Sequence, residues 1–299
     1  MNYILKYLIL VIITIVIACE IHLNRNQRYK NRKLIFSFWE PLGKIPGYLR
    51  LCIKTWEKFL PDYSIKILDY IGVKKYLGEA LFSSIIDRKM ALSMQADAIR
   101  VALLNKYGGI WMDTDTIILS KDFIKEFESF ELAMIGESKN NFQYIGFIFS
   151  SNHSHILQEW LRQIIKNTKN YKYIMENKNN SNIWKNAKKN KIKFDYLGNK
   201  IIDPIIKRIY INTKKYFRLD SSKIKCFPER YTNNSLNISE KYREFYFKKG
   251  DPKKVLQHSK SLILLHNSWT PSKYKIMSEK EFLKQDILLS KLLSQILNK

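Results

Sequence analysis

The sequence predicts an α/β protein with a single sheet flanked by helices. Segments with the alternating pattern of a strand are interleaved with segments of helical spacing, which is typical of a sheet that has helices on both faces. The chain has 299 residues, of which 45% are hydrophobic, so it can build one large core or two smaller ones. Nothing in the composition indicates global disorder.

The first elements follow one another closely. Residues 33–39 (KLIFSFW) predict a buried strand, and a loop with prolines and glycines separates it from a helix at residues 48–60. Residues 63–68 alternate as a strand does, and residues 89–107 have the spacing of a longer helix. Two glycines directly after this helix are a typical C-cap.

The second half of the chain contains the remaining strands and two more helices. Strand patterns cover residues 109–112, 131–135, 143–149 and 262–265. Residues 155–168 have helical spacing, and residues 278–297 predict a last helix that begins with a capping box of Ser278 and Glu281. Residues 166–193, rich in Lys, Asn and Tyr, are interpreted as an insertion. It is either a solvated, partly disordered segment or a basic surface that rests on anionic lipid.

The chain is strongly basic, with 52 Lys and Arg against 27 Asp and Glu and a formal net charge of +25. Such a charge fits a nucleic acid, an anionic membrane or a phosphate-bearing substrate, or an AT-rich genome that favours Lys, Asn and Ile. The cysteines Cys19, Cys52 and Cys226 are odd in number and widely spaced. They therefore predict neither a disulfide framework nor a zinc site, which fits a reducing compartment.

The N-terminus has the pattern of a membrane anchor. Residues 3–19 are apolar except for Lys6, and roughly 17 to 20 helical residues come close to a hydrocarbon core of about 30 Å. We expect an anchor at residues 1–24 and a basic linker at residues 25–32, whose positive charge places the rest of the chain in the cytoplasm. A secretory signal, or a lipoprotein cleavage box at residues 16–19, is the alternative.

The segment QADAIRVALLNKYGGIWMDTDT, residues 95–116, carries a candidate metal site. It ends a helix, turns through two glycines and presents Asp113 and Asp115 after a short strand. In an extended chain both carboxylates would point to the same side and could share a divalent cation, with phosphate and water completing its shell. Asp97 and Arg100 share a face of the preceding helix. The alternatives are an ordinary loop and a surface ion pair.

Two further clusters could bind a phosphorylated ligand. The strand at 262–265 is followed by His266, which could complete an Asp-rich cation site, or could simply be a packed histidine. After it come donors that could hold a diphosphate: Ser268, Trp269 and Lys273. Trp39 follows the first strand, where it could stack on a nucleobase or pack under the next loop.

Taken together, these motifs resemble the DXD-containing sugar transferases of the capsular polysaccharide synthesis type, which are related to Och1-like mannosyltransferases. The matching stretches are IFSFWEPLGKIP, LCIKTWEKFLPDYSIKILD, ADAIRVALLNKYGGIWMDTDT, IGFIFSSNHSHILQEWL and LLHNSWTPSKY. The resemblance extends over most of residues 33–293. It implies a GT-A glycosyltransferase fold at residues 33–299, a Rossmann-like mixed sheet, and transfer of a sugar with retention of anomeric configuration.

The resemblance also implies roles for individual residues. Mn²⁺ or Mg²⁺ would be bound by Asp115, with Asp113 and His266 as further candidate ligands. The residues expected to contact a UDP- or GDP-sugar donor are Trp39, Phe38, Asp97, Arg100, Asp113, Ser268, Trp269 and Lys273. The residues expected to act in catalysis are Asp113, Asp115 and Arg100.

The acceptor is expected to be a glycan or a lipid-linked saccharide, and the enzyme to work at the inner membrane of a bacterial cell. Residues 143–145 and 197–199 depart from the family's acceptor segments, so acceptor recognition is unassigned. No nucleic-acid partner is expected.

Two alternative functions remain open from the sequence. A phosphatase of the HAD type would use Asp113 and Asp115 in a DxDxT loop, but its later acidic pair has only Asp251 as a candidate. A non-enzymatic basic protein that binds nucleic acid or a membrane would explain the charge but not the two aspartates.

Overall fold

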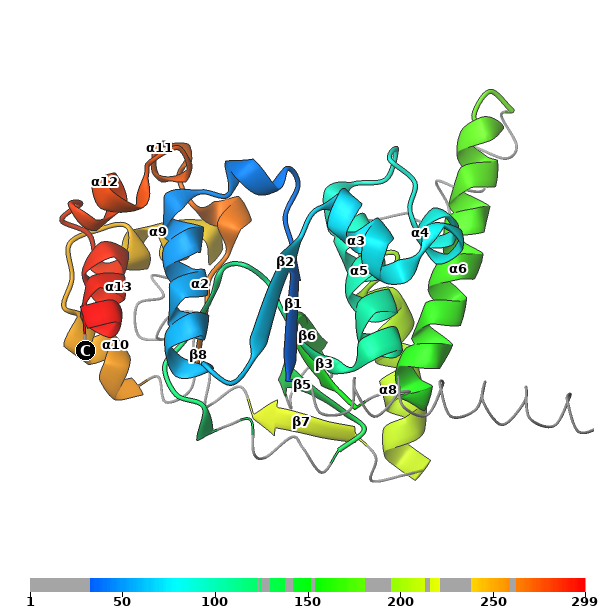
Figure 1. Cartoon of the computed structure of the whole chain (residues 1–299), viewed down its shortest axis with the longest axis horizontal. Helices are drawn as coiled ribbons and strands as arrows, with labels where there is room; N and C mark the ends of the chain where they lie inside the picture. The colour runs from blue at the N-terminus through cyan, green and yellow to red at the C-terminus, as the bar shows by residue number, and fades with distance from the viewer. Residues whose placement is uncertain are drawn as a thin grey trace, which may run out of the picture. The chain divides into compact units, whose positions relative to one another are not determined.

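A six-stranded mixed sheet lies at the centre of the protein, with helices on both of its faces (Figure 1). The strand order is β2-β1-β3-β6-β5-β7, in which β1, β2 and β3 are parallel and β6 is antiparallel to both of its neighbours. The strands are β1 (Leu34–Phe38), β2 (Ser64–Leu68), β3 (Gly109–Met112), β5 (Leu132–Glu137), β6 (Phe142–Ser150) and β7 (Tyr216–Asp220). A separate antiparallel pair joins β4 (Thr116–Ile118) to β8 (Leu262–Leu264). The predicted α/β class is confirmed.

The computed structural model describes residues 33–122, 124, 130–137, 142–151, 154–180, 195–212, 216–220, 238–258 and 262–298. From Leu34 onward these residues belong to one compact unit. The predicted anchor and basic linker, residues 1–24 and 25–32, lie outside the described residues. Within the described part of the chain, none of the helices has the length and hydropathy needed to cross a bilayer.

Side chains of the sheet alternate between two cores. Phe36 and Trp111 face the core formed with one group of helices, whereas Ile35 and Ile110 face the opposite side. The first group is α3 (Tyr70–Leu77), α4 (Glu79–Ile85), α5 (Leu92–Tyr107), α6 (His155–Glu176) and α8 (Asn199–Asn212). On the opposite side, Ile35 and Ile110 pack with α2 (Gly47–Phe59) and the β4–β8 pair. Together with α2, the second group of helices forms a further cluster; these helices are α9 (Ile238–Tyr246), α10 (Pro252–His258), α11 (Ser272–Lys275), α12 (Glu279–Leu283) and α13 (Leu288–Asn298). This alternation with a period of two is what a sheet covered on both faces requires.

The passage from α5 into β3 fixes where the candidate metal site lies. Gly108 ends α5 with a φ of 64°, and its N–H donates to the Leu104 carbonyl at 2.8 Å. Gly109 has a φ of 95° and lies so close to β1 that a Cβ there would be 2.5 Å from the Leu34 carbonyl oxygen. The predicted helix and its glycine C-cap are confirmed, with the start of the helix at Leu92.

Two predicted segments differ from the structure. Helix α6 runs to Glu176 and buries Thr168, Tyr171 and Ile174, so the first part of the predicted insertion is wrong. Residues 166–176 are an amphipathic continuation of α6. The last part of the predicted insertion, residues 181–193, lies outside the described residues. The predicted last helix is divided into α12 and α13, although its capping box is confirmed.

Replacing Gly109 with Ala should destabilise the protein strongly. A left-handed backbone costs a residue with a Cβ about 1–2 kcal/mol, and the contact with Leu34 adds to this. We expect Gly109→Ala to lower the free energy of unfolding by at least about 2 kcal/mol, which corresponds to a drop of roughly 4–8 °C in Tm. Gly43→Ala is the matched control, since no atom lies within 4 Å of a Cβ at Gly43. Equal Tm values for the two variants would contradict this.

Candidate active site

Strand β3 ends in a tight turn that carries both aspartates. The Asp113 N–H donates to the Gly146 carbonyl at 2.8 Å, which extends the β3–β6 pairing by one residue. The Thr116 N–H then donates to the Asp113 carbonyl at 3.0 Å, and β4 begins at Thr116. The expected extended geometry of the pair is therefore wrong, because Asp115 lies within a turn. The two carboxylates nonetheless interact electrostatically, since the charge of Asp113 raises the pKa of Asp115.

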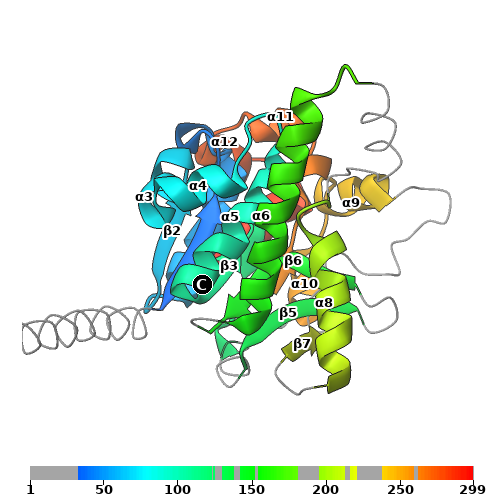
Figure 2. The same ribbon diagram turned by 90° about the vertical axis from the view of Figure 1, so that its right-hand side faces the viewer.

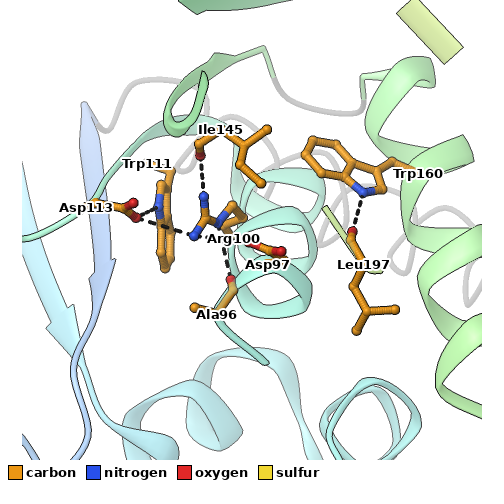
Figure 3. Close-up of polar contacts among 8 residues, drawn as sticks. All are labelled: Ala96, Asp97, Arg100, Trp111, Asp113, Ile145, Trp160 and Leu197. Carbon is orange, nitrogen blue, oxygen red and sulfur yellow. Dashed lines mark hydrogen bonds and ion pairs between the residues drawn. The ribbon is translucent and has the colours of Figure 1, made fainter. Parts of the chain in front are cut away.

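A bulge in β6 prepares a binding place for Arg100. On β5, Met134 and Ile135 are consecutive, but their partners on β6 are Ile148 and Tyr144. Residues between these partners are thus unpaired on the β5 side, and the free Ile145 carbonyl accepts a hydrogen bond from Nη1 of Arg100 (Figure 3). Bulges of this kind commonly redirect groups beside active sites.

Arg100 is a buried cation between two carboxylates (Figure 3). Its Nη2 lies 3.2 Å from Oδ1 of Asp97 and 3.4 Å from Oδ1 of Asp113. The guanidinium carbon is also 5.1 Å from the centre of the Trp111 ring, and the indole N–H of Trp111 donates to Oδ1 of Asp113 at 2.8 Å. The predicted Asp97, Arg100 and Asp113 are thereby brought together, and Asp113 is held by two donors.

The negative charge of Asp97, Asp113 and Asp115 exceeds the positive charge of Arg100, the cation that pairs with Asp97 and Asp113. Burial, together with the charges of Asp113 and Asp195, raises the pKa of Asp97 to about 7 against the lowering effect of Arg100. Burial and the neighbouring Asp113 carboxylate also raise the pKa of Asp115 well above its usual range. A group of buried carboxylates with this deficit of positive charge is a suitable place for a cation.

Asp97 is enclosed by the turn that precedes α8. A Cβ at Gly198 would lie 2.6 Å from Oδ2 of Asp97 and 2.7 Å from Cδ1 of Ile145. The turn is held in place by the buried Trp160, whose indole N–H donates to the Leu197 carbonyl at 2.9 Å (Figure 3). With only 5% of its surface exposed, Asp97 faces Arg100 on one side and protein backbone on the other.

The segment after β8 forms the other side of the site. The Asn267 N–H donates to Oδ2 of Asp115 at 2.7 Å, and the Leu265 N–H donates to the Asp115 carbonyl at 3.1 Å. The Asn267 side chain in turn accepts a hydrogen bond from the Tyr48 hydroxyl at 2.5 Å. Tyr48 is fully buried in α2, so the acidic turn is joined through Asn267 to the second helix group.

His266 lies between aromatic rings rather than among the carboxylates. Its ring centre is 3.9 Å from that of Trp269, and Tyr242 contacts it edge-on at 5.9 Å. Burial lowers the pKa of His266 to about 4, so the imidazole is neutral at pH 7. Among the residues that the structure describes, no three His, Cys, Asp or Glu side chains gather as a metal-binding set. His266 is thus not grouped with Asp113 and Asp115.

The remaining predicted residues differ in accessibility. Trp39 is half-buried at the end of β1 and packs against the core that contains Tyr48. Phe38 is buried on the other face of the sheet, where its ring contacts Tyr70 edge-on at 5.1 Å. Ser268 is exposed, and so is Lys273, whose ammonium lies 4.9 Å from the ring centre of its neighbour Tyr274. Trp269 is half-buried.

Sequence reasoning missed several residues that shape the site. Trp111 and Tyr48 have the apolar neighbours of ordinary core positions, and their polar atoms gave no signal in the pattern. Gly146, within the strand pattern that follows the acidic pair, could have been noticed. A Cβ there would lie 2.6 Å from Oδ2 of Asp113, so only glycine leaves room for the carboxylate.

The fold and the site define an α/β protein with a buried acidic centre beyond the carboxyl end of parallel strands, where open α/β sheets bind their ligands. The family of capsular polysaccharide synthesis proteins matches residues 14–258, and the chain belongs to this family. The family prediction is confirmed. A glycosyltransferase is also the enzyme class that the sequence predicts.

Three similar structures are glycosyltransferases. The PaToxG glycosyltransferase is 15% identical, with 64% of this chain and 77% of that chain covered and a TM-score of 0.37. GlyE of Streptococcus pneumoniae TIGR4 is 10% identical, with 89% and 64% covered and a TM-score of 0.38. Mouse xyloside xylosyltransferase 1 in its apo form is 10% identical, with 80% and 99% covered and a TM-score of 0.38. No curated protein matches the chain.

Removing the positive charge of Arg100 should destabilise the protein. Arg100→Met leaves the buried Asp97 uncompensated, and breaking a buried pair in this way costs about 3–5 kcal/mol of unfolding free energy. The exposed Arg50, which donates to the Ile45 carbonyl, gives the matched control Arg50→Met, with an expected change below about 1 kcal/mol.

A double variant separates charge from shape. Asp97→Asn combined with Arg100→Met should lose less stability than Arg100→Met alone, because the unpaired buried charge is gone. Denaturant unfolding measures all three changes. An Arg100→Met loss no larger than that of Arg50→Met would show that the ion pair is not a structural requirement.

Proposed function

We propose that this protein is a glycosyltransferase of the GT-A type, which transfers a sugar from a UDP- or GDP-sugar to a glycan or lipid-linked saccharide in capsular polysaccharide synthesis. The observation that carries the proposal is the buried acidic turn at the end of β3, with Asp115 bonded to Asn267 and Asp113 bonded to Trp111. Membership of the capsular polysaccharide synthesis family supports the same function.

The acidic turn fits a divalent metal ion. Hard cations such as Mn²⁺ and Mg²⁺ prefer carboxylate oxygens, and the raised pKa of Asp115 indicates negative charge that the protein itself does not balance. We propose Asp115 as the principal ligand and Asp113 as a ligand either directly or through water. A bound ion would supply positive charge to the diphosphate as it leaves.

Arg100 acts in this proposal as a positioning residue. Its ion pair with Asp113, together with the indole N–H of Trp111, fixes one Asp113 oxygen and leaves the other available. The neutral His266 and the ring of Trp269 belong to the segment after β8, which contacts the acidic turn at Asp115. Ser268, Trp269 and Lys273 are proposed to contact the diphosphate, for which Lys273 brings an exposed positive charge.

Glycosyl transfer also requires an acceptor hydroxyl to be placed against the anomeric carbon. No described side chain is placed as a general base for this step, and attack on the face from which the diphosphate departs needs none. In that case a phosphate oxygen of the leaving group takes the proton, and the configuration is retained. Retention is therefore the stereochemical outcome that we propose.

The cellular location is proposed from the sequence. Membership of a capsular polysaccharide synthesis family is consistent with work on the cell surface. We propose that the segment at residues 1–24 holds the protein in the inner membrane, with the catalytic domain in the cytoplasm. The phosphatase alternative gains no support from Asp251, which accepts a hydrogen bond from the Lys253 N–H at the start of α10.

Asp115→Asn is the direct test of the proposed site. The amide keeps an acceptor for the Asn267 N–H but removes the charge, so activity should fall by at least about 10²–10³-fold. The Tm should stay equal or rise, because a buried charge is lost. The assay is release of UDP or GDP from nucleotide sugars with Mn²⁺, using the full chain.

The exposed Asp62 provides the matched control, and Asp62→Asn should keep wild-type activity. Hydrolysis of phosphate monoesters without turnover of any nucleotide sugar would instead favour the phosphatase. Activity in Asp115→Asn close to wild type would remove Asp115 from the site.

Trp39→Ala should weaken donor binding without a comparable loss of stability. Stacking of a base on an aromatic ring is worth about 1–3 kcal/mol, which corresponds to roughly 5- to 150-fold in Kd. Phe38→Ala is the neighbouring control. Because Phe38 is buried, its truncation should lower the unfolding free energy by about 3–5 kcal/mol and leave donor affinity unchanged in the folded protein.

Calorimetric titration of UDP- and GDP-sugars in the presence of Mn²⁺ measures both affinities. Unchanged donor affinity in Trp39→Ala would exclude stacking on Trp39. A large loss of affinity in folded Phe38→Ala would assign the donor contact to Phe38 instead.

A further inference from the structure

Large apolar side chains that are exposed in the described part of the chain belong to segments along one edge of the sheet. They are Leu42 (38% exposed), Ile71 (81%), Leu92 (48%), Tyr173 (56%), Ile276 (87%) and Leu283 (37%). Single exposed apolar residues are ordinary, whereas several on one surface mark an interaction site. We call the surface that carries these six residues the apolar end face.

The topology explains why these residues share an end. Strands β1, β2 and β3 are parallel, and Leu42 and Ile71 follow the carboxyl ends of β1 and β2. Leu92 is the first residue of α5, whose far end leads directly into β3, so Leu92 lies at the same level. Ile276 follows β8, which reaches this level beside the acidic turn, where Leu265 contacts Asp115.

Hydrogen bonds connect these segments in pairs. The Gly47 N–H at the start of α2 donates to the Met277 carbonyl at 3.2 Å, beside Ile276. The Tyr70 N–H at the start of α3 donates to Oε2 of Glu40 at 3.1 Å. The Tyr171 hydroxyl, near the end of α6, donates to the Lys89 carbonyl at 3.0 Å, three residues before Leu92. Figure 1 shows α11 and α12 on one side of the sheet, the end of α6 on the other and α3 between them, all in the upper part of the view, and Figure 2 also has α6, α11 and α12 reach the upper part.

Positive charge surrounds the apolar side chains. Each contributing segment has more basic than acidic residues, and these segments are residues 39–50, 69–75, 86–92, 169–180 and 266–281. Around Ile276, the charged residues that line a groove are Lys44, Arg50, Lys275 and Lys280 with Glu279 and Glu281, which leaves an excess of positive charge. Apolar side chains among lysines and arginines are typical of surfaces that lie on anionic lipid.

We propose that the apolar end face binds the surface of an anionic lipid bilayer. The exposed apolar side chains would enter the headgroup region, and the surrounding cations would pair with lipid phosphates. A second copy of this chain is a poorer occupant, because two faces of like charge would repel each other. The contact would be made by exposed side chains of the folded domain and is distinct from the segment at residues 1–24 that we propose as an anchor.

The consequence for catalysis rests on the proposed function. The acidic turn also lies beyond the carboxyl end of β3, so a bilayer on this face would be next to the candidate active site. A lipid-linked acceptor could then reach the active site from the membrane. This would supply an acceptor site, which the sequence leaves unassigned because residues 143–145 and 197–199 depart from the family's acceptor segments. The binding itself requires neither donor nor activity.

The test compares the full chain in lipid nanodiscs of phosphatidylcholine with nanodiscs that also contain phosphatidylglycerol. Hydrogen–deuterium exchange read by mass spectrometry reports which peptides are covered. We expect slower exchange in peptides over residues 40–50, 69–77 and 272–283 only with the anionic lipid, and loss of that protection at high salt. Peptides from β5 and the start of α6 should not change.

Two matched pairs of substitutions remove the same charge at different places. Lys44→Gln with Lys280→Gln alters the apolar end face, whereas Lys253→Gln with Lys254→Gln alters exposed residues of α10, before the start of β8. The first pair should lose most of the lipid-dependent protection, and the second should retain it. Ile71→Ser with Ile276→Ser should also lose most of it while keeping the wild-type Tm.

Three outcomes would overturn the proposal. These are protection that does not depend on phosphatidylglycerol, equal loss of protection in both lysine pairs, and protection that increases with protein concentration without lipid. The last would assign the face to contact between copies of the chain. Because no nucleotide sugar is used, failure of this test leaves the glycosyltransferase proposal unaffected, and the reverse also holds.

Discussion

The site depends on a single buried cation. Arg100 is the guanidinium shared by Asp97 and Asp113, and it reaches them because the bulge in β6 leaves the Ile145 carbonyl free to accept its Nη1. The left-handed Gly108 sets the direction in which α5 passes into β3, which aligns Arg100 with the acidic turn. The bulge in β6 and the end of α5 are therefore both needed to place Arg100 beside the carboxylates. Without Arg100 the buried carboxylates would have no cationic partner, which costs folding free energy.

The acidic turn also joins two hydrophobic clusters. Its Asp113 side belongs to the core formed with α5 and α6, through Trp111 and Arg100. Its Asp115 side is bonded to Asn267, and Asn267 to Tyr48 in the cluster that α2 forms with α9 to α13. The family match ends at residue 258, so this second wall is contributed by a segment beyond the matched residues. A site between two packed halves can hold a ligand in fixed geometry while each half remains rigid.

The same topology places the candidate active site and the exposed apolar side chains at one end of the sheet. Parallel strands direct their following loops to one edge, which is where α/β proteins collect ligands. Ile71, in the first turn of α3 after β2, and Ile276, which follows β8 and α11, are the most exposed of the large apolar side chains in the described residues. A protein that acts on lipid-linked saccharides would benefit from having its lipid contact and its reacting groups on one face.

The sequence by itself determined the α/β class, the helix that ends in a glycine pair and the acidic residues after β3, because these depend on local periodicity and turn chemistry. It did not determine that Asp115 lies in a turn, or that the His266 ring packs against Trp269. Only the tertiary structure decided these points, as it decided the burial of Asp97 beneath Gly198. The physical reason is that hydrogen bonds between segments more than a hundred residues apart, and the desolvation of charges, leave no periodic trace in a sequence.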